Sequence, residues 1–317
     1  MPVITIPDVD TLLAGDLGQW LQGQAEARRE AKRKAWQRWI AGLVLGAPLL
    51  LCFGGEGFVW QALGYAGLGI IAIGFTLGGI IRQNMVSSLK REMNGALART
   101  LGISFDPAAR FGDEFNLAYA YDLLPGYTRK TCEDLWEGEL GGTRFCLYEA
   151  TLIERRGSGK DRRDVTVFRG VILTIRFARD FHGVTLVERQ KMRLALFGDS
   201  LTKNGMKLER VKMVDPRFEK TFDVYGSDQV EARYLVHPAY CERLVALEER
   251  FQGKSLKALF HKGDVVVVVD SEDLFESASL NPERDRELLG RTIDQFRALA
   301  EMIASLNERR REGVGAG

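Results

Sequence analysis

Histidine and cysteine are scarce in this chain of 317 residues, which contains three histidines and four cysteines. His182, His237 and His261 have no i, i+4 spacing with one another, so a zinc site would need ligands from distant residues. The cysteines form neither a CxxC motif nor a regular framework, and Cys52 lies in an apolar segment. We therefore expect reduced thiols, no metal site and no cofactor.

Charge is nearly absent from one stretch. Residues 39–81 contain a single charged residue, Glu56, although 27% of the chain is charged. Glycines around Glu56 divide this stretch into apolar runs at residues 39–53 and 58–81. A helix rises about 1.5 Å per residue and the hydrocarbon core is about 30 Å thick, so the second run is long enough to cross a bilayer. The first run reaches about 20 residues if it begins at Trp36 and continues through the glycines.

This pattern excludes a fully soluble protein and a polytopic transporter. It predicts a two-helix transmembrane hairpin over residues 39–81, since two helices with a tight turn satisfy the backbone in lipid. A single span with a re-entrant segment is the alternative.

Lysine and arginine flank the apolar stretch on its outer sides and are missing from its turn. Six precede it and four follow it: Arg28, Arg29, Lys32, Arg33, Lys34 and Arg38, then Arg82, Lys90, Arg91 and Arg99. By the positive-inside rule, both termini and the main domain are cytoplasmic. Trp36 and Trp39 at one end and Trp60 at the other fit interfacial aromatic belts.

Small-residue pairs occur in both apolar runs, Gly42 with Gly46 and Gly74 with Gly78. Such pairs let helix backbones approach closely. They indicate either packing of the two helices on each other or self-association with a second copy or another membrane protein.

The other segments follow from composition and periodicity. Residues 1–38 form a cytoplasmic, amphipathic and basic segment, in which leucines between 12 and 21 suggest one short helix that lies on the membrane or docks on the main domain. Residues 82–101 form a membrane-proximal helix. Residues 102–280 form the cytoplasmic α+β domain, residues 281–310 an amphipathic helix and residues 311–317 a disordered tail.

Strand patterns dominate the first half of the α+β domain. Residues 145–153, 165–177 and 184–188 are β-branched and aromatic runs separated by turn residues, so we expect antiparallel hairpins. Asp215 and Pro216 then begin a short helical turn with Phe218 and Phe222 on one face. Helices follow at residues 229–235, where Asp228 and Glu231 have capping-box spacing, and at 238–251. Residues 259–260 and the valines 265–269 form a final hairpin, whose second strand is buried on both faces.

The last helix carries an apolar stripe that docks on its own domain, on the helix at 83–101 or on another subunit. We favour the second, because that helix has a matching apolar row.

Several segments together resemble a known family. They are residues 133–149, Val167-Phe168-Arg169-Gly170, the segment 215–225, residues 227–235 and Pro238. This pattern is similar to the bacterial membrane-associated family catalogued as domain of unknown function 3137, over residues 100 to 260 or so. The resemblance implies a bacterial inner-membrane protein with a hairpin ahead of a cytoplasmic domain, and it implies no activity. Genes of this family often lie near genes for LemA-type membrane proteins, which points to another membrane protein as a partner.

Two motifs resemble catalytic or phosphate-binding strings and fail on chemistry. Residues 197–202 are similar to a GDSL hydrolase block, whose serine needs a histidine base with an aspartate three residues before it. Here Tyr234 stands three residues before His237, and Ala258 stands three residues before His261, so Ser200 has no such pair. We expect Ser200 in a turn. Residues 155–163 lack phosphate-loop spacing, so they form either a solvated hairpin loop or a lipid contact.

Arg233 stands between apolar neighbours, so we expect it to be half-buried against a carboxylate from Asp228, Glu231 or the pair 133–134. The sequence therefore predicts a membrane-tethered cytoplasmic interaction or scaffold domain, without catalytic residues and without nucleic acid as a partner. Its candidate binding residues are Arg169, Asp228, Glu231, Arg233 and Tyr234. The alternative is an enzyme acting on a lipid or anionic small molecule, with one open pocket joining Arg169 and Arg233.

Overall fold

The computed structural model describes residues 6–176, 182–189, 200–213, 219, 221–271 and 278–312. The chain divides into two compact units. The helical unit comprises Asp8–Leu97 and Ser277–Gly290, and the sheet unit comprises the first seven residues, Ala98–Glu276 and Arg291–Gly317.

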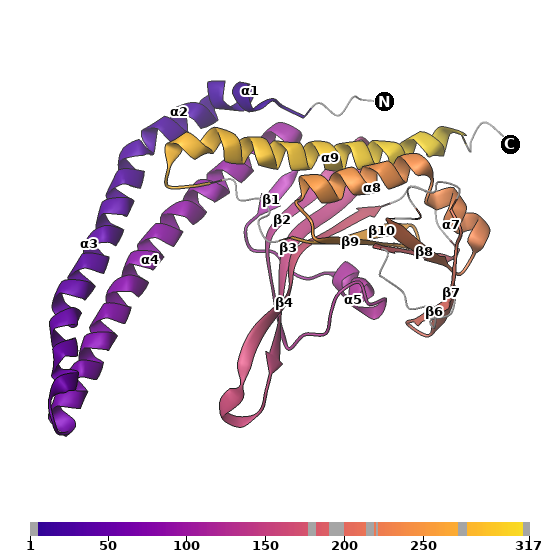
Figure 1. The fold of residues 1–317 in the computed structure, drawn as a ribbon. Coiled ribbons are helices and arrows are strands. Elements are labelled where there is room, and N and C mark those ends of the chain that lie inside the picture. Colours follow the sequence, from indigo (N-terminus) through magenta and orange to yellow (C-terminus); the bar gives the residue numbers. More distant parts are fainter. Residues whose placement is uncertain are drawn as a thin grey trace. The chain divides into compact units, whose positions relative to one another are not determined.

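The helical unit is built on two long helices, shown in indigo and purple in Figure 1. After the short helices α1 (Val9–Ala14) and α2 (Asp16–Gly23), the chain forms α3 (Ala25–Leu50), the 3₁₀ turn η1 (Leu51–Gly54) and α4 (Phe58–Leu101). Gly57 turns the chain between them at φ +105°, a conformation that suits glycine. The predicted helical hairpin is therefore present, and residues 82–101 continue the second helix without a break.

Glycines form the seam between α3 and α4. A Cβ atom added to Gly74 would lie 2.8 Å from the Cα of Gly42, and one added to Gly67 would lie 2.6 Å from the carbonyl oxygen of Gly46. A Cβ on Gly78 would lie 2.8 Å from the carbonyl oxygen of Ala35. These contacts place all four glycines of the predicted pairs inside the helix pair, which favours the packing alternative. Self-association through them stays a prediction.

The N-terminal segment forms two helices where the sequence predicts one. Leu12, Leu17 and Leu21 are buried. Asp10 pairs with Arg286, which lies in the first turn of α9 (Asp285–Glu312) after the 3₁₀ turn η3 (Pro282–Arg284). The segment thus docks on the start of the last helix within the helical unit.

The sheet unit contains a ten-stranded antiparallel sheet. Its order is β1-β2-β3-β4-β10-β9-β5-β8-β7-β6. The strands are β1 (Ser104–Asp106), β2 (Arg129–Leu140), β3 (Thr143–Arg156), β4 (Arg163–Arg176), β5 (Val184–Arg189), β6 (Ser200–Lys203), β7 (Met206–Arg210), β8 (Phe222–Gly226), β9 (Ser255–His261) and β10 (Asp264–Asp270).

Two-residue turns with positive φ join three of the hairpins. Gly141-Gly142 joins β2 to β3, Asn204-Gly205 joins β6 to β7, and Lys262-Gly263 joins β9 to β10. Such turns match the right-handed twist of paired strands, so they fix the register of each hairpin.

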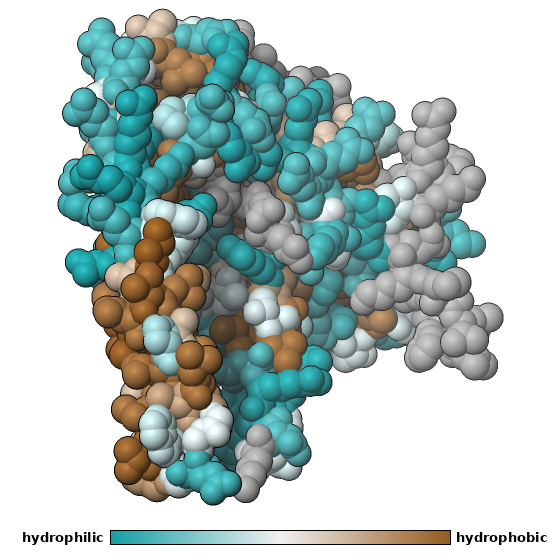
Figure 2. Space-filling view, turned by 60° about the vertical axis from the view of Figure 1, so that its left-hand side comes forward, coloured by the Kyte–Doolittle hydropathy of each residue, from teal (hydrophilic) through white to brown (hydrophobic). Residues whose placement is uncertain are grey.

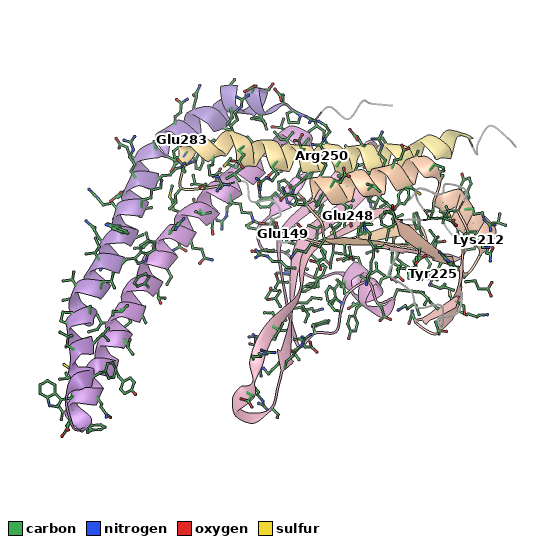
Figure 3. The ribbon with its side chains drawn as sticks, in the orientation of Figure 1. Glu149, Lys212, Tyr225, Glu248, Arg250 and Glu283 are labelled. Atoms are coloured by element: carbon green, nitrogen blue, oxygen red, sulfur yellow. The ribbon has the colours of Figure 1, made fainter. Side chains whose placement is uncertain are left out.

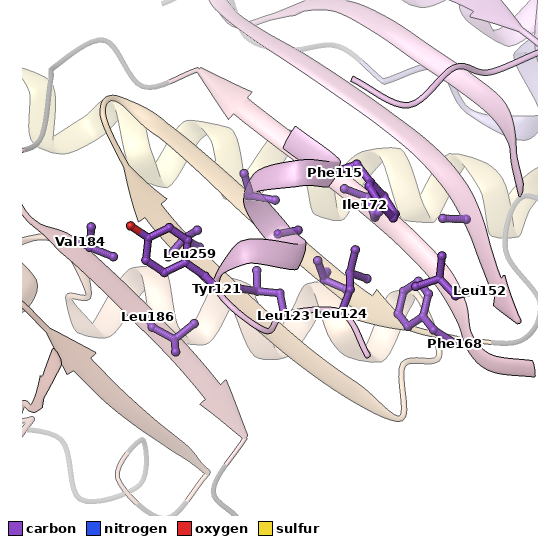
Figure 4. Close-up of a cluster of buried hydrophobic side chains, with 14 of the residues drawn as sticks. Phe115, Tyr121, Leu123, Leu124, Leu152, Phe168, Ile172, Val184, Leu186 and Leu259 are labelled. Carbon is purple, nitrogen blue, oxygen red and sulfur yellow. The ribbon is translucent and has the colours of Figure 1, made fainter. Parts of the chain in front are cut away.

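The two faces of the sheet carry different layers. On one face, α5 (Asp113–Ala120) and the segment after it pack into the cluster drawn in Figure 4, which includes Phe115, Leu124, Ile172 and Leu259. On the other face lie α8 (Pro238–Arg250) and α9. Ring centroids are 5.3 Å apart for Tyr240 on Phe260 and 4.7 Å apart for Phe296 on Trp136. Valines 265–269 alternate between these layers, and their predicted burial on both faces is confirmed.

Most predicted elements of the α+β domain are present, with two corrections. The helix at 229–235 is α7 (Gln229–Leu235), and α8 ends one residue before the expected Phe251. Phe222, expected in a helical turn, begins strand β8, while Phe218 lies outside the described residues. Ser200, expected in a turn, begins strand β6. The last helix packs on its own sheet through Phe296. Its first residues, up to Gly290, belong to the same compact unit as α4 up to Leu97, which includes most of the docking site that we favoured.

Candidate functional site

Arg233 is exposed, which corrects the expectation of a half-buried arginine held by a carboxylate. Its Nε donates to the carbonyl oxygen of Lys212 at 3.2 Å, and its Nη2 donates to Oε1 of Gln229 at 3.2 Å. Lys212 lies beside α7 in Figure 3. Both partners are neutral, and none of the described carboxylates forms an ion pair with Arg233. The guanidinium of Arg233 is exposed to solvent because only Ala232 and Leu235 of α7 are buried.

Asp228 and Glu231 have structural contacts of two kinds. Asp228 caps α7 by accepting hydrogen bonds from the backbone N–H groups of Val230 at 2.8 Å and Glu231 at 3.0 Å. Glu231 does not close the predicted capping box. Its carboxylate accepts from the N–H groups of His182 at 3.0 Å and Gly183 at 2.7 Å. The acid therefore ties α7 to the loop that enters β5.

Arg169 lies far from this group. It sits on β4, while α7 follows β8, and three strands separate β4 from β8. At about 4.8 Å per strand step, the two strands are about 19 Å apart. The structure thus brings Asp228, Glu231, Arg233 and Tyr234 together on or next to α7 and leaves Arg169, which is also exposed, on a separate part of the sheet.

A pocket that the sequence did not indicate lies on the α5 face of the sheet. Its volume is about 420 Å³, and its walls come from the segment after α5 and from β4, β9 and β10. It is lined by Asp122, Leu123, Leu124, Pro125, Gly126, Val167, Phe168, Ser255, Lys257, Val268 and Asp270. It contains neither Arg169 nor Arg233.

Lysines hold the segment that forms the pocket's rim. Lys257 Nζ donates to the carbonyl oxygens of Asp122 at 2.7 Å and Leu123 at 3.1 Å. Lys203 Nζ pairs with the Asp122 carboxylate at 2.7 Å. Asp122 itself has φ +56°, so these contacts hold a backbone conformation that an L residue seldom adopts.

A third lysine is enclosed by rings at the other end of α5. Lys130 Nζ lies 3.9 Å from the ring centroid of Phe115, 4.4 Å from that of Phe111 and 5.9 Å from that of Tyr127. Rings at these distances attract an ammonium group through their quadrupoles. No local pattern marks this cluster, because its members lie in two short stretches, residues 111–115 and 127–130, that the fold brings together.

The thiols and phenols near α5 are poor acids. Burial, with Glu114 and Glu137 nearby, raises the pKa of Cys146 to about 12. Burial likewise raises the pKa of Cys132, and the pKa of Tyr148 is raised by burial and by Glu114. These groups stay protonated at neutral pH and have no activated nucleophile among them. No cluster of three or more metal-ligating side chains occurs in the part of the chain that the structure describes.

The other motifs take ordinary places. Ser200 is exposed on β6 and pairs by backbone with Glu209. The basic stretch at 155–163 forms the tip of the β3–β4 hairpin around η2 (Gly159–Asp161). Two of its arginines face acids there: Arg155 Nε lies 3.2 Å from Asp164, and Arg156 Nε lies 2.6 Å from Glu154.

The most unusual surface of the molecule is on the helix pair. Sixteen large apolar side chains are exposed between residues 40 and 80: Ile40, Leu43, Val44, Leu45, Leu51, Phe53, Phe58, Val59, Trp60, Leu63, Tyr65, Leu68, Ile73, Phe75, Leu77 and Ile80. Figure 2 shows hydrophobic side chains gathered over the lower part of the helix pair, with hydrophilic ones above. Two helices here are long and apolar enough to cross a membrane, by length and composition.

A model of the family described as protein of unknown function (DUF3137) matches residues 166–308. The match covers a little under half of the chain. The predicted resemblance is thereby confirmed, although the match begins later and ends later than the expected range of about 100 to 260. The comparison with curated proteins gave no match.

The solved structures include one likeness, to the mycobacterial trehalose monomycolate transport factor A, TtfA. Its TM-score is 0.32 and its sequence identity is 9%, over 67% of this chain and 95% of that chain. Values this low support no statement about function. The DUF3137 match itself extends from β4 into α9, so it includes α7, whereas the helix pair α3–α4 lies outside it.

Proposed function

We propose that this protein is a membrane-tethered interaction or scaffold protein of the bacterial inner membrane, in which α3 and α4 cross the bilayer and both termini lie in the cytoplasm. The observation that carries the proposal is the belt of exposed apolar side chains between residues 40 and 80. Soluble surfaces rarely expose contiguous apolar patches of this extent. A bilayer is the partner that accepts such a belt around the whole helix pair.

The length of the apolar belt and the tryptophans at its two edges also support a bilayer as its surroundings. Residues 58–81 of α4 span about 36 Å at about 1.5 Å per residue, which exceeds a hydrocarbon core of about 30 Å. Trp36, 60% exposed, stands at one edge of the belt and Trp60, 49% exposed, at the other. Lysines and arginines occur only beyond the edge marked by Trp36, so the turn between the helices is the translocated end.

The partner surface that we propose is the outer face of α7. Val230 is 77% exposed there and lies beside Asp228, while Arg233 extends from the same helix. Asp228 and Glu231 accept hydrogen bonds from backbone N–H groups. Val230 and Arg233 are exposed on this face, and with Tyr234 beside them they are the residues that a partner would contact.

The native cysteines offer a test of the topology. Cys52 lies in the turn between the helices, and the other three cysteines are in the sheet unit. In a variant that keeps Cys52 alone, a membrane-impermeant maleimide should label intact cells. Ser158→Cys in a background without native cysteines should be labelled only after permeabilisation, because the β3–β4 tip is exposed but cytoplasmic. Labelling of Ser158→Cys in intact cells would refute the orientation, and extraction of the protein by alkaline carbonate would refute the insertion.

The partner face is tested by Val230→Asp with Arg233→Glu, both exposed substitutions. We expect an unchanged melting temperature and the loss of membrane proteins that co-purify in mild detergent with the parent. The matched control is Lys207→Glu with Glu209→Lys on β7, which reverses an exposed ion pair of the same unit. Retention of every co-purifying protein by the α7 variant would place the partner face elsewhere.

A further inference from the structure

The basic end of α3 is sorted into two faces. Arg29, Lys32, Arg33 and Trp36 are exposed. Lys32 and Arg33 stand three and four residues after Arg29, and Trp36 stands three residues after Arg33, so the four share one side of the helix. The opposite side, with Arg28, Ala31 and Ala35, is buried. The exposed side of the helix is therefore a cationic stripe, Arg29, Lys32 and Arg33, that ends at Trp36.

The cations of the stripe are not held in ion pairs with the described carboxylates, although Arg33 is close enough to Glu30 to help lower the pKa of that acid. Lys34, on another side of α3, pairs with Glu30 at 2.9 Å. In contrast, none of Arg29, Lys32 and Arg33 forms an ion pair with a carboxylate of the described residues. The β3–β4 tip is different, because its arginines are partly neutralised by Glu154 and Asp164. Unpaired cations are the ones that gain most from an anionic ligand.

We propose that Arg29, Lys32 and Arg33 form a binding site for the phosphate headgroups of anionic phospholipids. The proposal rests on the membrane insertion of α3 and α4 and adds the class of lipid that surrounds them. Trp36 marks the depth of the interface. At about 1.5 Å per residue, Arg33, Lys32 and Arg29 lie about 5, 6 and 10 Å beyond it along the axis. This range is about one Debye length at physiological salt, so all three act on headgroups at the surface.

The second helix contributes a cation at the same depth. Gly78 packs against Ala35, and α3 and α4 are antiparallel, so Arg82 comes level with the turn of α3 that contains Lys32. Arg82 is exposed. A headgroup phosphate at this level meets cations from both helices, whereas no lysine or arginine lies at the turn near Trp60.

Brominated lipids test the proposal, because bromine quenches tryptophan on contact. The full-length protein is placed in phosphatidylcholine vesicles that contain a small share of either brominated phosphatidylglycerol or brominated phosphatidylcholine. The contribution of Trp36 is the difference between the parent and Trp36→Phe, and that of Trp60 is obtained with Trp60→Phe. We expect Trp36 to be quenched more by the anionic lipid and Trp60 equally by both.

The variant Arg29→Gln/Lys32→Gln/Arg33→Gln should abolish the preference at Trp36, with a loss of relative lipid affinity of roughly fivefold per cation at low salt. Lys34→Gln is the matched control and should retain the preference, because Lys34 is already paired with Glu30.

The other outcomes separate the two proposals. Equal quenching of Trp36 by both lipids would overturn the headgroup site and leave membrane insertion standing. An anionic preference that survives in the triple variant would also overturn it, since other cations would then be responsible. Absence of quenching at both tryptophans would overturn the insertion on which the site rests.

Discussion

The ion pair between Arg28 and Asp285 is expected to hold the last helix on α3 within the helical unit. Two nitrogen–oxygen distances, 2.9 and 2.8 Å, join Nη1 of Arg28 to both carboxylate oxygens. The side chains are 1% and 10% exposed. Arg28 Nε and Nη2 are buried without a hydrogen-bond partner among the described residues, so Asp285 is the group that compensates this charge.

Removing the acid should be costly, and removing both partners should not. Asp285→Asn leaves a buried, uncompensated guanidinium, and breaking such a pair typically costs about 3–5 kcal/mol. Arg28→Met with Asp285→Leu replaces the pair by apolar side chains of similar size, which is often neutral or stabilising by about 1–4 kcal/mol. The difference in the free energy of unfolding between Asp285→Asn and the double variant therefore reports the cost of an unpaired charge, and not the loss of side-chain volume.

Arg28→Met alone should be sensitive to pH. Burial raises the pKa of Asp285, while Arg28 opposes this. Without Arg28 the folded-state pKa rises further above the unfolded one. A carboxyl shifted in this direction favours folding below its unfolded pKa and loses that stability as the pH rises through the folded pKa. The variant should therefore be closest to the parent at acidic pH and weakest at neutral pH. Asp285→Asn has no titrating carboxyl at this position, so the stability of that variant should not itself follow this titration.

Hydrogen exchange of the protein in detergent or nanodiscs measures the effect locally. A cost of about 3–5 kcal/mol corresponds to roughly two to four powers of ten in exchange rate at about 1.4 kcal/mol per tenfold change. Amides of α3 around Arg28 and of the first turns of α9 should speed up together in Asp285→Asn, while those of β9 and β10 should not. Less than a tenfold change at both segments would refute the idea that this pair holds the helices together.

Three further outcomes test packing and acidity elsewhere. Gly74→Leu should destabilise the α3–α4 pair by about 1–3 kcal/mol in thermal unfolding in detergent, because its side chain would meet backbone atoms of the partner helix; Gly69→Leu is the control, with no atom within 4 Å. Lys130→Gln should lower stability by about 0.5–2 kcal/mol in urea unfolding, against little change for the exposed Lys207→Gln. Cys146, with a pKa of about 12, should be alkylated at pH 8 far more slowly in the native protein than after unfolding, and equal rates would contradict its burial.

Local signals in the sequence predict much of the fold. Asp228, three residues before Glu231, and Pro238 after His237 mark the starts of α7 and α8. Both N-caps are present, and His237 Nδ1 accepts from the N–H group of Tyr240 at 3.3 Å. The valines of β10 were recognisable as a fully buried strand because no polar residue interrupts them. Each of these signals lies within a few residues of the element that it specifies.

The errors occur where distant contacts decide. Phe222 belongs to β8 because it pairs with Arg189 of β5, next to the pair of Asp223 with Glu188, and no local pattern reveals this pairing. Likewise, apolar neighbours in sequence suggested that Arg233 is half-buried, but on a helix of seven residues only Ala232 and Leu235 face inward. The pocket beside Phe168 was missed since its walls come from four separate segments of the chain.

The excess of lysine and arginine at the outer sides of residues 39–81 remains after the paired cations are discounted. Arg28, one of the ten cations counted at the outer sides of the apolar stretch, is buried against Asp285 and offers no charge to a membrane surface. Lys34 is paired with Glu30 and contributes less than its formal charge. Discounting both still leaves Arg29, Lys32, Arg33 and Arg38 before the stretch and no cation at its turn. Because the bias depends on this contrast between the two ends and not on the total, the structure alters which residues carry it without altering its direction.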